Sequence, residues 1–446
     1  MISRFRLAWI LAPLTFPLAL AGCGDAFNAG PMRYVESERL TTELKKPELQ
    51  SAVRTAMKDL FGEDPQHMKV PPGAGLPGGG YRLGSQVIDP ADGKKMRRVL
   101  WVPEGGDPKK DAVPQVGGYG LYRQHCLHCH GVSGAGDGPT APFLYPRPRD
   151  YRRGIFKFTS TASGQKPTRD DLRNTIANGL HGTSMPAFDA LMSANEIEQV
   201  LDYMMFLSMR GETELALIDE AAAAGELPAD VVADVSKSVF NKWKLAPSQV
   251  LNPPVPKPPS TRESVLRGRD LFLSRNTTGN KVDCTSCHGP QAVGDGPSFV
   301  SQDVFNEVVF GGDPSAQNDR LEEIARRVEK ETTSRTKDPE AGKAEAAKLR
   351  EAWKNSLDDW GMPLRPNNLN RGVYKGGRRP IDLYWRIAKG INGAKMPAHY
   401  PTIEPEKIWD LVNFVLALPE DKGLLEGATL PAAPPPPLPK PSVAVR

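Results

Sequence analysis

Two short runs of the pattern C-x-x-C-H constrain this chain of 446 residues more than any other feature. They read Cys126-Leu127-His128-Cys129-His130 and, 158 residues further on, Cys284-Thr285-Ser286-Cys287-His288. Two thiols three residues apart lie on one face of a helical turn, where they can add to the two vinyl groups of one haem. The adjacent histidine can then reach the iron. The two runs therefore predict two covalently attached haems of the c type.

The alternative for two C-x-x-C pairs is a single zinc site with four cysteine ligands. Haem is favoured because a histidine directly follows each pair and because the gap between the pairs far exceeds a zinc-ribbon loop. Each pair also lies in its own copy of a larger repeat. A thioredoxin-like dithiol fits less well, because no βαβ pattern surrounds either pair.

The repeat extends well beyond the haem runs. Each run is followed by the tetrad Gly-Asp-Gly-Pro, and residues 172–204 then align without a gap on residues 383–415. This alignment places Met185 on Met396, and a proline follows each of them. The pattern predicts two related domains.

Each copy of the repeat closes with an amphipathic helix. In the first copy, Ser193 and Glu196 form a capping box, and an apolar stripe at helical spacing follows. An N-terminal helix, a C-x-x-C-H turn, a Met-Pro loop and a closing helix, in that order, resemble the class I cytochrome c fold. The resemblance implies a mainly α protein. Its two tandem class I cytochrome c-like domains would be joined by Pro/Gly-rich linkers, with a helical insertion in the second.

The predicted division of the chain follows from this repeat and from the composition of the segments around it. It comprises a lipoprotein signal peptide (1–22), an N-terminal appendage (23–115), cytochrome c domain 1 (116–210), a linker (211–261), cytochrome c domain 2 (262–420) and a Pro-rich tail (421–446). The insertion in the second domain spans about 298–360 and carries two apolar helical stripes. These stripes predict either a helical hairpin on the domain surface or an element that docks a partner.

The sixth ligand of each iron is the main inference beyond the haem runs. Class I cytochromes place a thioether opposite the proximal histidine, and the resemblance assigns this role to Met185 and Met396. His181 and His399 are the nearest competitors, but neither recurs in the repeat. Arginines that do recur near the haem loops could pair with haem propionates, or could form a solvated positive face. They are Arg147, Arg153, Arg365 and Arg371.

The fifth cysteine, Cys23, ends an N-terminal segment with the layout of a signal peptide. Two arginines precede an apolar stretch that is too short for a comfortable membrane span, and Leu20-Ala21-Gly22-Cys23 resembles a bacterial lipobox. We therefore expect an exported protein on the periplasmic side of a bacterial membrane, anchored by lipidated Cys23. The net charge of +4 gives no reason to expect nucleic acid as a partner.

Histidine/methionine coordination fills both axial positions of an iron, which suits electron transfer better than substrate turnover. We therefore predict a non-enzymatic electron-transfer protein that passes single electrons between a redox donor and a redox acceptor, as part of or next to a membrane respiratory complex. Two alternatives remain open: an enzyme that resembles di-haem peroxidases, and a cytochrome-based redox or gas sensor. The enzyme would need one haem with an open or displaceable ligand, and the sensor would use the insertion as its output element.

Overall fold

The structure is a computed structural model that describes residues 32–65, 67–76, 117–274 and 282–428, together with four short strands. The strands form two antiparallel ribbons, β1 (Val87–Ile88) with β2 (Met96–Arg97) and β3 (Val99–Trp101) with β4 (Val113–Gln115). The other regular elements of the described chain are helices, so the predicted mainly α fold is confirmed. The signal peptide, Cys23 and residues 429–446 of the tail lie outside the described residues.

The first module is built on a pair of crossing helices. Its helices are α4 (Gly117–His125), α5 (Leu127–His130), η1 (Ala141–Phe143), α6 (Arg169–Asn178) and α7 (Ala194–Ala224). Helix α4 crosses α7 at Gly118, where a Cβ atom would overlap the carbonyl oxygen of Gln199. Glycine is required there because the two backbones touch. The predicted capping box of Ser193 and Glu196 is present at the start of α7.

Three more helices enlarge the core of the first module. They are α1 (Arg39–Thr42), α2 (Pro47–Phe61) and α8 (Ala229–Leu245), and the turn η2 (Ala246–Gln249) follows α8. The ring of Phe61 lies 5.7 Å from Phe206 on α7 and 6.3 Å from Phe240 on α8. The N-terminal segment 32–76 therefore shares one hydrophobic core with the first module.

The second module repeats the helix crossing of the first. Its helices are α9 (Arg262–Phe272), α10 (Cys284–His288), η4 (Leu369–Arg371), α14 (Pro380–Lys389), α15 (Pro405–Ala417) and η5 (Lys422–Leu425). Helix α9 crosses α15 at Gly268, where a Cβ atom would overlap the carbonyl oxygen of Asp410. The ring of Phe272 packs 5.3 Å from that of Phe414 in the core behind the crossing.

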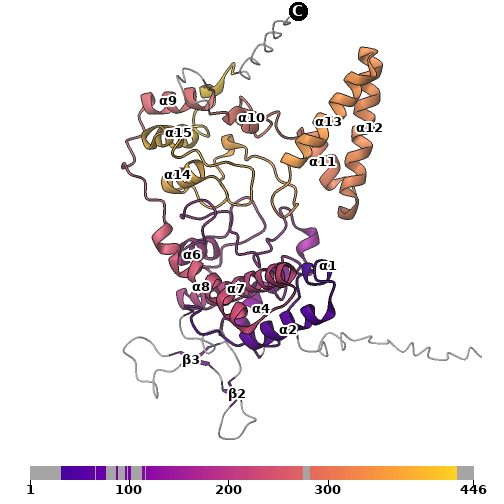
Figure 1. Cartoon of the computed structure of the whole chain (residues 1–446). Helices are drawn as coiled ribbons and strands as arrows, with labels where there is room; N and C mark the ends of the chain where they lie inside the picture. The colour runs from indigo at the N-terminus through magenta and orange to yellow at the C-terminus, as the bar shows by residue number, and fades with distance from the viewer. Residues whose placement is uncertain are drawn as a thin grey trace, which may run out of the picture.

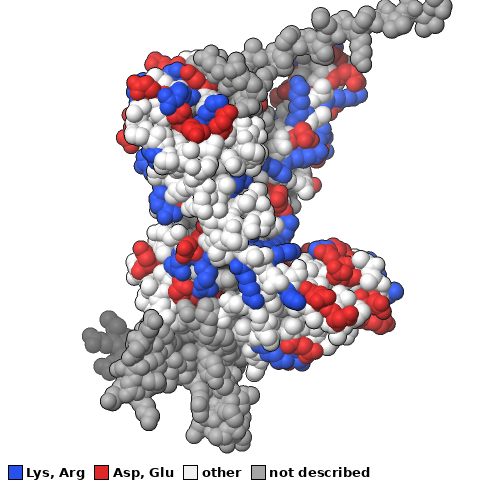
Figure 2. All heavy atoms as spheres, turned by 60° about the vertical axis from the view of Figure 1, so that its left-hand side comes forward, with Lys and Arg blue, Asp and Glu red and all other residues white. Residues whose placement is uncertain are grey.

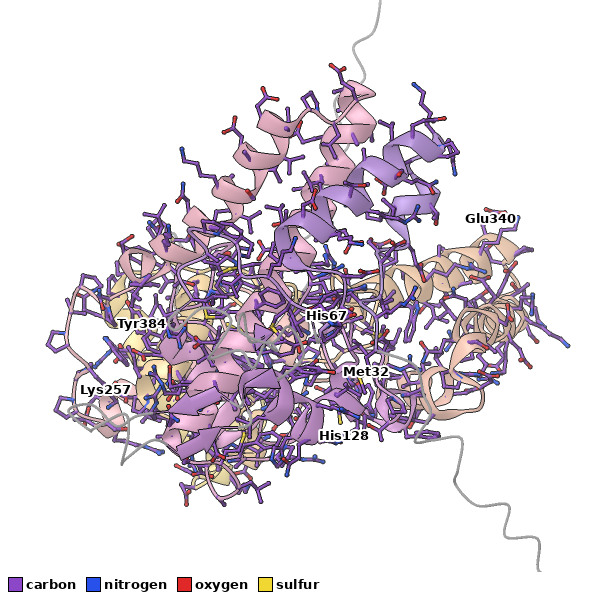
Figure 3. All side chains as sticks on the ribbon, turned by 90° about the horizontal axis from the view of Figure 1, so that it is seen from below. Met32, His67, His128, Lys257, Glu340 and Tyr384 are labelled. Atoms are coloured by element: carbon purple, nitrogen blue, oxygen red, sulfur yellow. The ribbon has the colours of Figure 1, made fainter. Side chains whose placement is uncertain are left out.

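The insertion of the second module forms a separate helical lobe at one side of the molecule (Figure 1). It consists of α11 (Gln302–Phe310), η3 (Pro314–Ala316), α12 (Gln317–Thr336) and α13 (Pro339–Asn355). Leu321 and Ile324 of α12 pack with Trp353 of α13 in a small core of their own, so the two predicted apolar stripes face each other. Seen from below, Glu340 on this lobe and Lys257 in the linker lie at opposite edges of the molecule (Figure 3).

The two modules are stacked, with α9, α14 and α15 above and α4, α6 and α7 below (Figure 1). The Pro-rich linker runs along the second module, where the indole N–H of Trp385 donates to the carbonyl of Leu251 at 2.8 Å. Asn392 of the second module joins the first, donating to the carbonyl of Phe156 at 3.2 Å and accepting from the N–H of Gly164 at 3.2 Å. None of the described helices is both long and apolar enough to cross a membrane.

Candidate cofactor site

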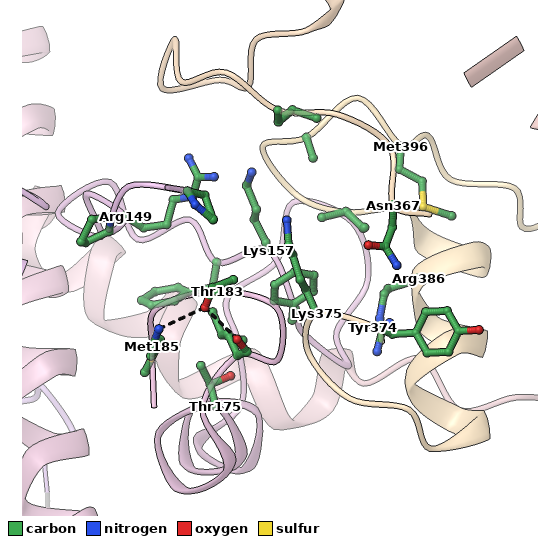
Figure 4. A pocket seen from close by; sticks show the side chains of 18 of the residues that line it. Arg149, Lys157, Thr175, Thr183, Met185, Asn367, Tyr374, Lys375, Arg386 and Met396 are labelled. Atoms are coloured by element: carbon green, nitrogen blue, oxygen red, sulfur yellow. Dashed lines mark hydrogen bonds between the residues drawn. The ribbon is translucent and has the colours of Figure 1, made fainter. Parts of the chain in front are cut away.

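A single cavity of about 920 Å³ lies between the two modules. Its walls include both C-x-x-C-H runs, so that the two predicted haem sites open into one space. Met185 from the first module and Met396 from the second also line it (Figure 4). The cavity thus brings together eight of the predicted site residues, namely Cys126, Cys129, His130, Met185, Cys284, Cys287, His288 and Met396. Cys23, the predicted lipidation site, lies outside the described residues.

The cysteines lie on short helices whose turn brings each pair to the cavity. The N–H of His130 donates to the carbonyl of Cys126 at 2.9 Å, which closes the turn around the first pair. All four cysteines are free thiols. Burial raises the pKa of Cys126 and of Cys284 to about 12, so both thiols are neutral near pH 7.

The two histidines of the runs are placed to ligate iron. Desolvation in the enclosed cavity lowers the pKa of His130 to about 4 and lowers the pKa of His288, so both rings are neutral. Nδ1 of His288 lies 3.3 Å from the carbonyl oxygen of Asn367. Nδ1 of His130 is buried beside the backbone of Arg149 but makes no hydrogen bond among the described residues. A carbonyl that accepts from Nδ1 fixes the ring and leaves Nε2 free for a metal.

The two methionine loops have the same backbone geometry. The N–H of Leu180 donates to the carbonyl of Met185 at 3.1 Å, and the N–H of Ile391 donates to that of Met396 at 3.1 Å. In the first module the N–H of Met185 also donates to the hydroxyl of Thr183 at 3.1 Å (Figure 4). The structure therefore presents one thioether to the cavity from the same loop of each module.

The two competing histidines differ in position. His399 lines the cavity, and desolvation lowers its pKa. His181 is exposed and is not among the residues that line the cavity. Met185 therefore has no histidine competitor from its own loop, while Met396 shares its side of the cavity with His399.

The walls of the cavity carry many cations. Of the four arginines predicted near the haem loops, Arg147 and Arg365 line it, whereas Arg153 and Arg371 are exposed outside it. Five further cations that the sequence did not single out also line it, namely Arg149, Lys157, Lys375, Arg386 and Lys395. Among the described residues that line the cavity, Asp283 alone is acidic. Lys and Arg side chains also gather at the waist between the modules on the face shown in Figure 2.

Two lysines form a close pair among these cations. Lys157 and Lys375 hold equivalent places in the repeat and extend next to each other (Figure 4). Burial lowers the pKa of Lys157 to about 8 and lowers that of Lys375. An anionic group in the cavity would oppose this shift, and haem propionates are such groups. The recurrence of Arg-Gly-x-aromatic-Lys in the repeat was the signal that could have identified both lysines.

The residues present thus fit haem. Paired free thiols, a buried histidine, a thioether loop and a cationic wall occur in each half of the cavity. In the described part of the chain, including this cavity, no three His, Cys, Asp or Glu side chains are grouped so that they could hold a bare metal ion.

Comparison with known proteins agrees with this assignment for the first module. Residues 115–204 match the family model described as cytochrome C oxidase, cbb3-type, subunit III. A solved structure, the reducing HAO-like protein complex of Kuenenia stuttgartiensis, is similar at 22% identity and a TM-score of 0.42, over 68% of this chain and 94% of that one. No curated protein sequence matches the chain. Residues 115–204 are therefore similar to a cytochrome c domain, a kind of domain that binds haem covalently.

Proposed function

We propose that this chain is a membrane-anchored di-haem electron carrier that passes single electrons between respiratory partners outside the cytoplasmic membrane. The observation that carries the proposal is the shared cavity, which is lined by two complete sets of cysteine, histidine and methionine residues. The family matched by residues 115–204 is named after a subunit of an oxidase complex, which supports a membrane respiratory complex as partner.

The residues of the chain have separate tasks in this proposal. A bound haem supplies a one-electron couple. His130 with Met185, and His288 with Met396, would hold the two haem irons. A histidine and a methionine at each haem would leave no ligand position for peroxide or gas. The thioether, a soft ligand, stabilises the reduced form and raises the potential.

The haem count and the axial ligands can be tested together. The pyridine haemochrome assay should give two haems per chain. Met185→Leu and Met396→Leu should each remove about half of the Met-to-iron charge-transfer absorption and lower one midpoint potential. Met204→Leu is a matched control, because Met204 also lines the cavity but lies on α7 outside the Met-Pro loop.

Three results would count against the carrier. An unchanged spectrum in Met396→Leu would make His399 the ligand to examine. Rapid binding of carbon monoxide by the unmodified protein would reveal an open coordination site and favour the sensor. Reduction of peroxide at enzymatic rates would favour the peroxidase-like enzyme.

Anchoring is proposed through Cys23, on the basis of the lipobox-like sequence alone. A Cys23→Ser variant should be found in the soluble fraction after cell breakage, whereas the unmodified protein should sediment with membranes. A single lipid chain binds only marginally, so stable attachment would depend on multiple acylation at this cysteine. Sedimentation of the variant in the absence of partners would contradict the anchor.

A further inference from the structure

The far end of the insertion lobe contacts the first module as well as its own, where the N–H of Asp359 donates to the carbonyl of Gly393 at 3.1 Å. Directly after α13, the residues Asp358, Asp359 and Trp360, which we call the clamp segment, lie against the loop 145–157 of the first module. We propose that the insertion serves as an inter-module clamp, which holds the two haem sockets face to face so that electrons pass between the haems within one chain. This inference rests on the proposed function, since it presumes that both sockets bind haem.

The charge at the centre of the clamp is buried and fully engaged. The carboxylate of Asp358 has no exposed surface, and it pairs with Arg149 and, at 3.0 Å, with Nζ of Lys157. The backbone N–H groups of Trp360 and Met362 donate to its other oxygen, each at 3.0 Å. Both cations belong to the first module, so each pair crosses between modules. A buried carboxylate held by two partly buried cations cannot be lost without leaving unpaired charge in the interface.

The indole of Trp360 adds a second point of attachment. Its N–H donates to the carbonyl of Asp150 at 2.9 Å. The guanidinium of Arg149 lies 5.0 Å from the ring centroid, and that of Arg153 lies 5.6 Å from it. These contacts are in the range of cation–π interactions. Arg153 also donates to the carbonyl of Asp359 at 2.7 Å.

The near end of the insertion contacts the same loop. The ring of Tyr145 in the first module packs edge-on against Phe305 and Phe310 of α11, with centroid distances of 5.9 and 5.1 Å. The lobe is therefore fastened to the first module where it begins and where it ends. This arrangement explains why an insertion of the second module carries its own small core: the core keeps the two fastening points at a fixed separation.

The clamp also reaches the cofactor site. Arg149 and Lys157, the two partners of Asp358, both line the shared cavity. Asp358 thus positions two cations of the first module against the cavity wall while it ties that module to the second. Electron transfer between cofactors slows steeply as they move apart, so fixing the two sockets face to face bears directly on the rate.

The clamp segment contains its own matched control. Asp358 and Asp359 are adjacent and chemically identical, but the side chain of Asp359 is half exposed and only its backbone contacts the first module. In the full-length holoprotein, Asp358→Asn should shift the iron-to-iron distance distribution, measured by pulsed electron paramagnetic resonance, to longer and broader values. Small-angle X-ray scattering should show a larger radius of gyration. Asp359→Asn should change neither measurement. Asp358→Glu retains a carboxylate and should bring both measurements most of the way back to those of the unmodified protein.

A milder variant keeps the proposal testable if Asp358→Asn does not fold. Trp360→Phe retains the ring but loses the hydrogen bond to Asp150, and it should give a smaller shift in the same direction. The clamp is overturned if Asp358→Asn, or Trp360→Phe in its place, matches Asp359→Asn in both measurements. A count of one haem in the unmodified protein would instead overturn the proposed function, and scattering would still test the clamp.

Discussion

The two modules surround their haem histidines with different chemistry. In the first, the hydroxyl of Tyr151 donates to that of Tyr122 at 2.6 Å, and Tyr122 donates to the carbonyl of Gly131 at 2.8 Å. The ring of Tyr151 lies 5.3 Å from that of His130. In the second module, Phe272 and Leu369 stand at the equivalent places. The repeat therefore preserves the ligands and the helix crossing, while the packing behind the histidine is free to be polar or apolar.

The modules also differ in where additional chain is attached. Helices α1, α2 and α8 extend the core of the first module, whereas α11, α12 and α13 build a core separate from that of the second. The first addition enlarges the core of its own module. The second addition does not enlarge the core of its own module, and it contacts the neighbouring module. Four predictions test this comparison.

Loss of a haem should give the largest difference in stability between the two modules. Cys126→Ala with Cys129→Ala, and Cys284→Ala with Cys287→Ala, should each remove half of the haem absorbance. Because the second core lacks the added helices, its loss of haem should destabilise its module more, by roughly 5 kcal/mol or about 10–20 °C in Tm. Circular dichroism melting of both double variants tests this. A lower Tm for the first-module variant would show that the added helices do not compensate for haem.

The helix crossings should respond alike, because both modules depend on the same close approach. Gly118→Ala and Gly268→Ala each place a Cβ atom on a backbone carbonyl of the partner helix, which should cost about 3 kcal/mol in the free energy of unfolding. Urea unfolding measures the cost. Gly423→Ala is the control, since it meets no such overlap and its φ is not positive. Unequal costs in the two modules would break the equivalence of the crossings.

The tyrosine pair should matter in one module only. Tyr122→Phe leaves the hydroxyl of Tyr151 and the carbonyl of Gly131 without this partner in a buried setting, at a cost of about 2 kcal/mol. The reciprocal Phe272→Tyr adds a hydroxyl with no tyrosine at Leu369 to pair with, so it should not stabilise the second module. Chemical unfolding of both variants decides the matter. A stabilising Phe272→Tyr would mean that the polarity of the first module carries no special role.

The smallest effect concerns Lys389, whose Nζ is buried without a hydrogen-bond partner among the described residues. Burial lowers its pKa from 10.5 to about 8, so the unfolded chain binds the proton more tightly than the folded chain. The free energy of unfolding should therefore rise as the pH increases from 8 towards 10.5. Lys389→Met should abolish this rise and add about 1 kcal/mol at pH 7.

The first module provides the control for Lys389. Asn178 stands at the equivalent place in the repeat and is exposed, so Asn178→Met should change the free energy of unfolding by less than about 0.5 kcal/mol. Unfolding curves at pH 7, 8 and 10 would be compared for both variants. A pH dependence that survives in Lys389→Met would have to come from another buried base, such as Lys157.

Much of the fold was determined by short stretches of sequence. The capping box of Ser193 and Glu196, the two apolar stripes of the insertion and the mainly α character were all predicted and are present. Helix periodicity and capping involve residues within a few positions of one another, so a single sequence carries the whole signal. Helices α1 and α2 are separate because the chain breaks before Pro47, and proline is favoured in the first turn of a helix and not in its interior.

Only the tertiary structure decided how the two haem sockets meet. The pairing of Asp358 with Arg149 joins residues 209 positions apart, and the neighbouring lysines Lys157 and Lys375 come from different modules. No local pattern marks such pairs, because their energy depends on how two finished domains dock. The sequence by itself predicted what each module binds, through the C-x-x-C-H runs and the Met-Pro repeat. Docking decided that both sites open into one cavity, because a surface between modules exists only after each module has folded.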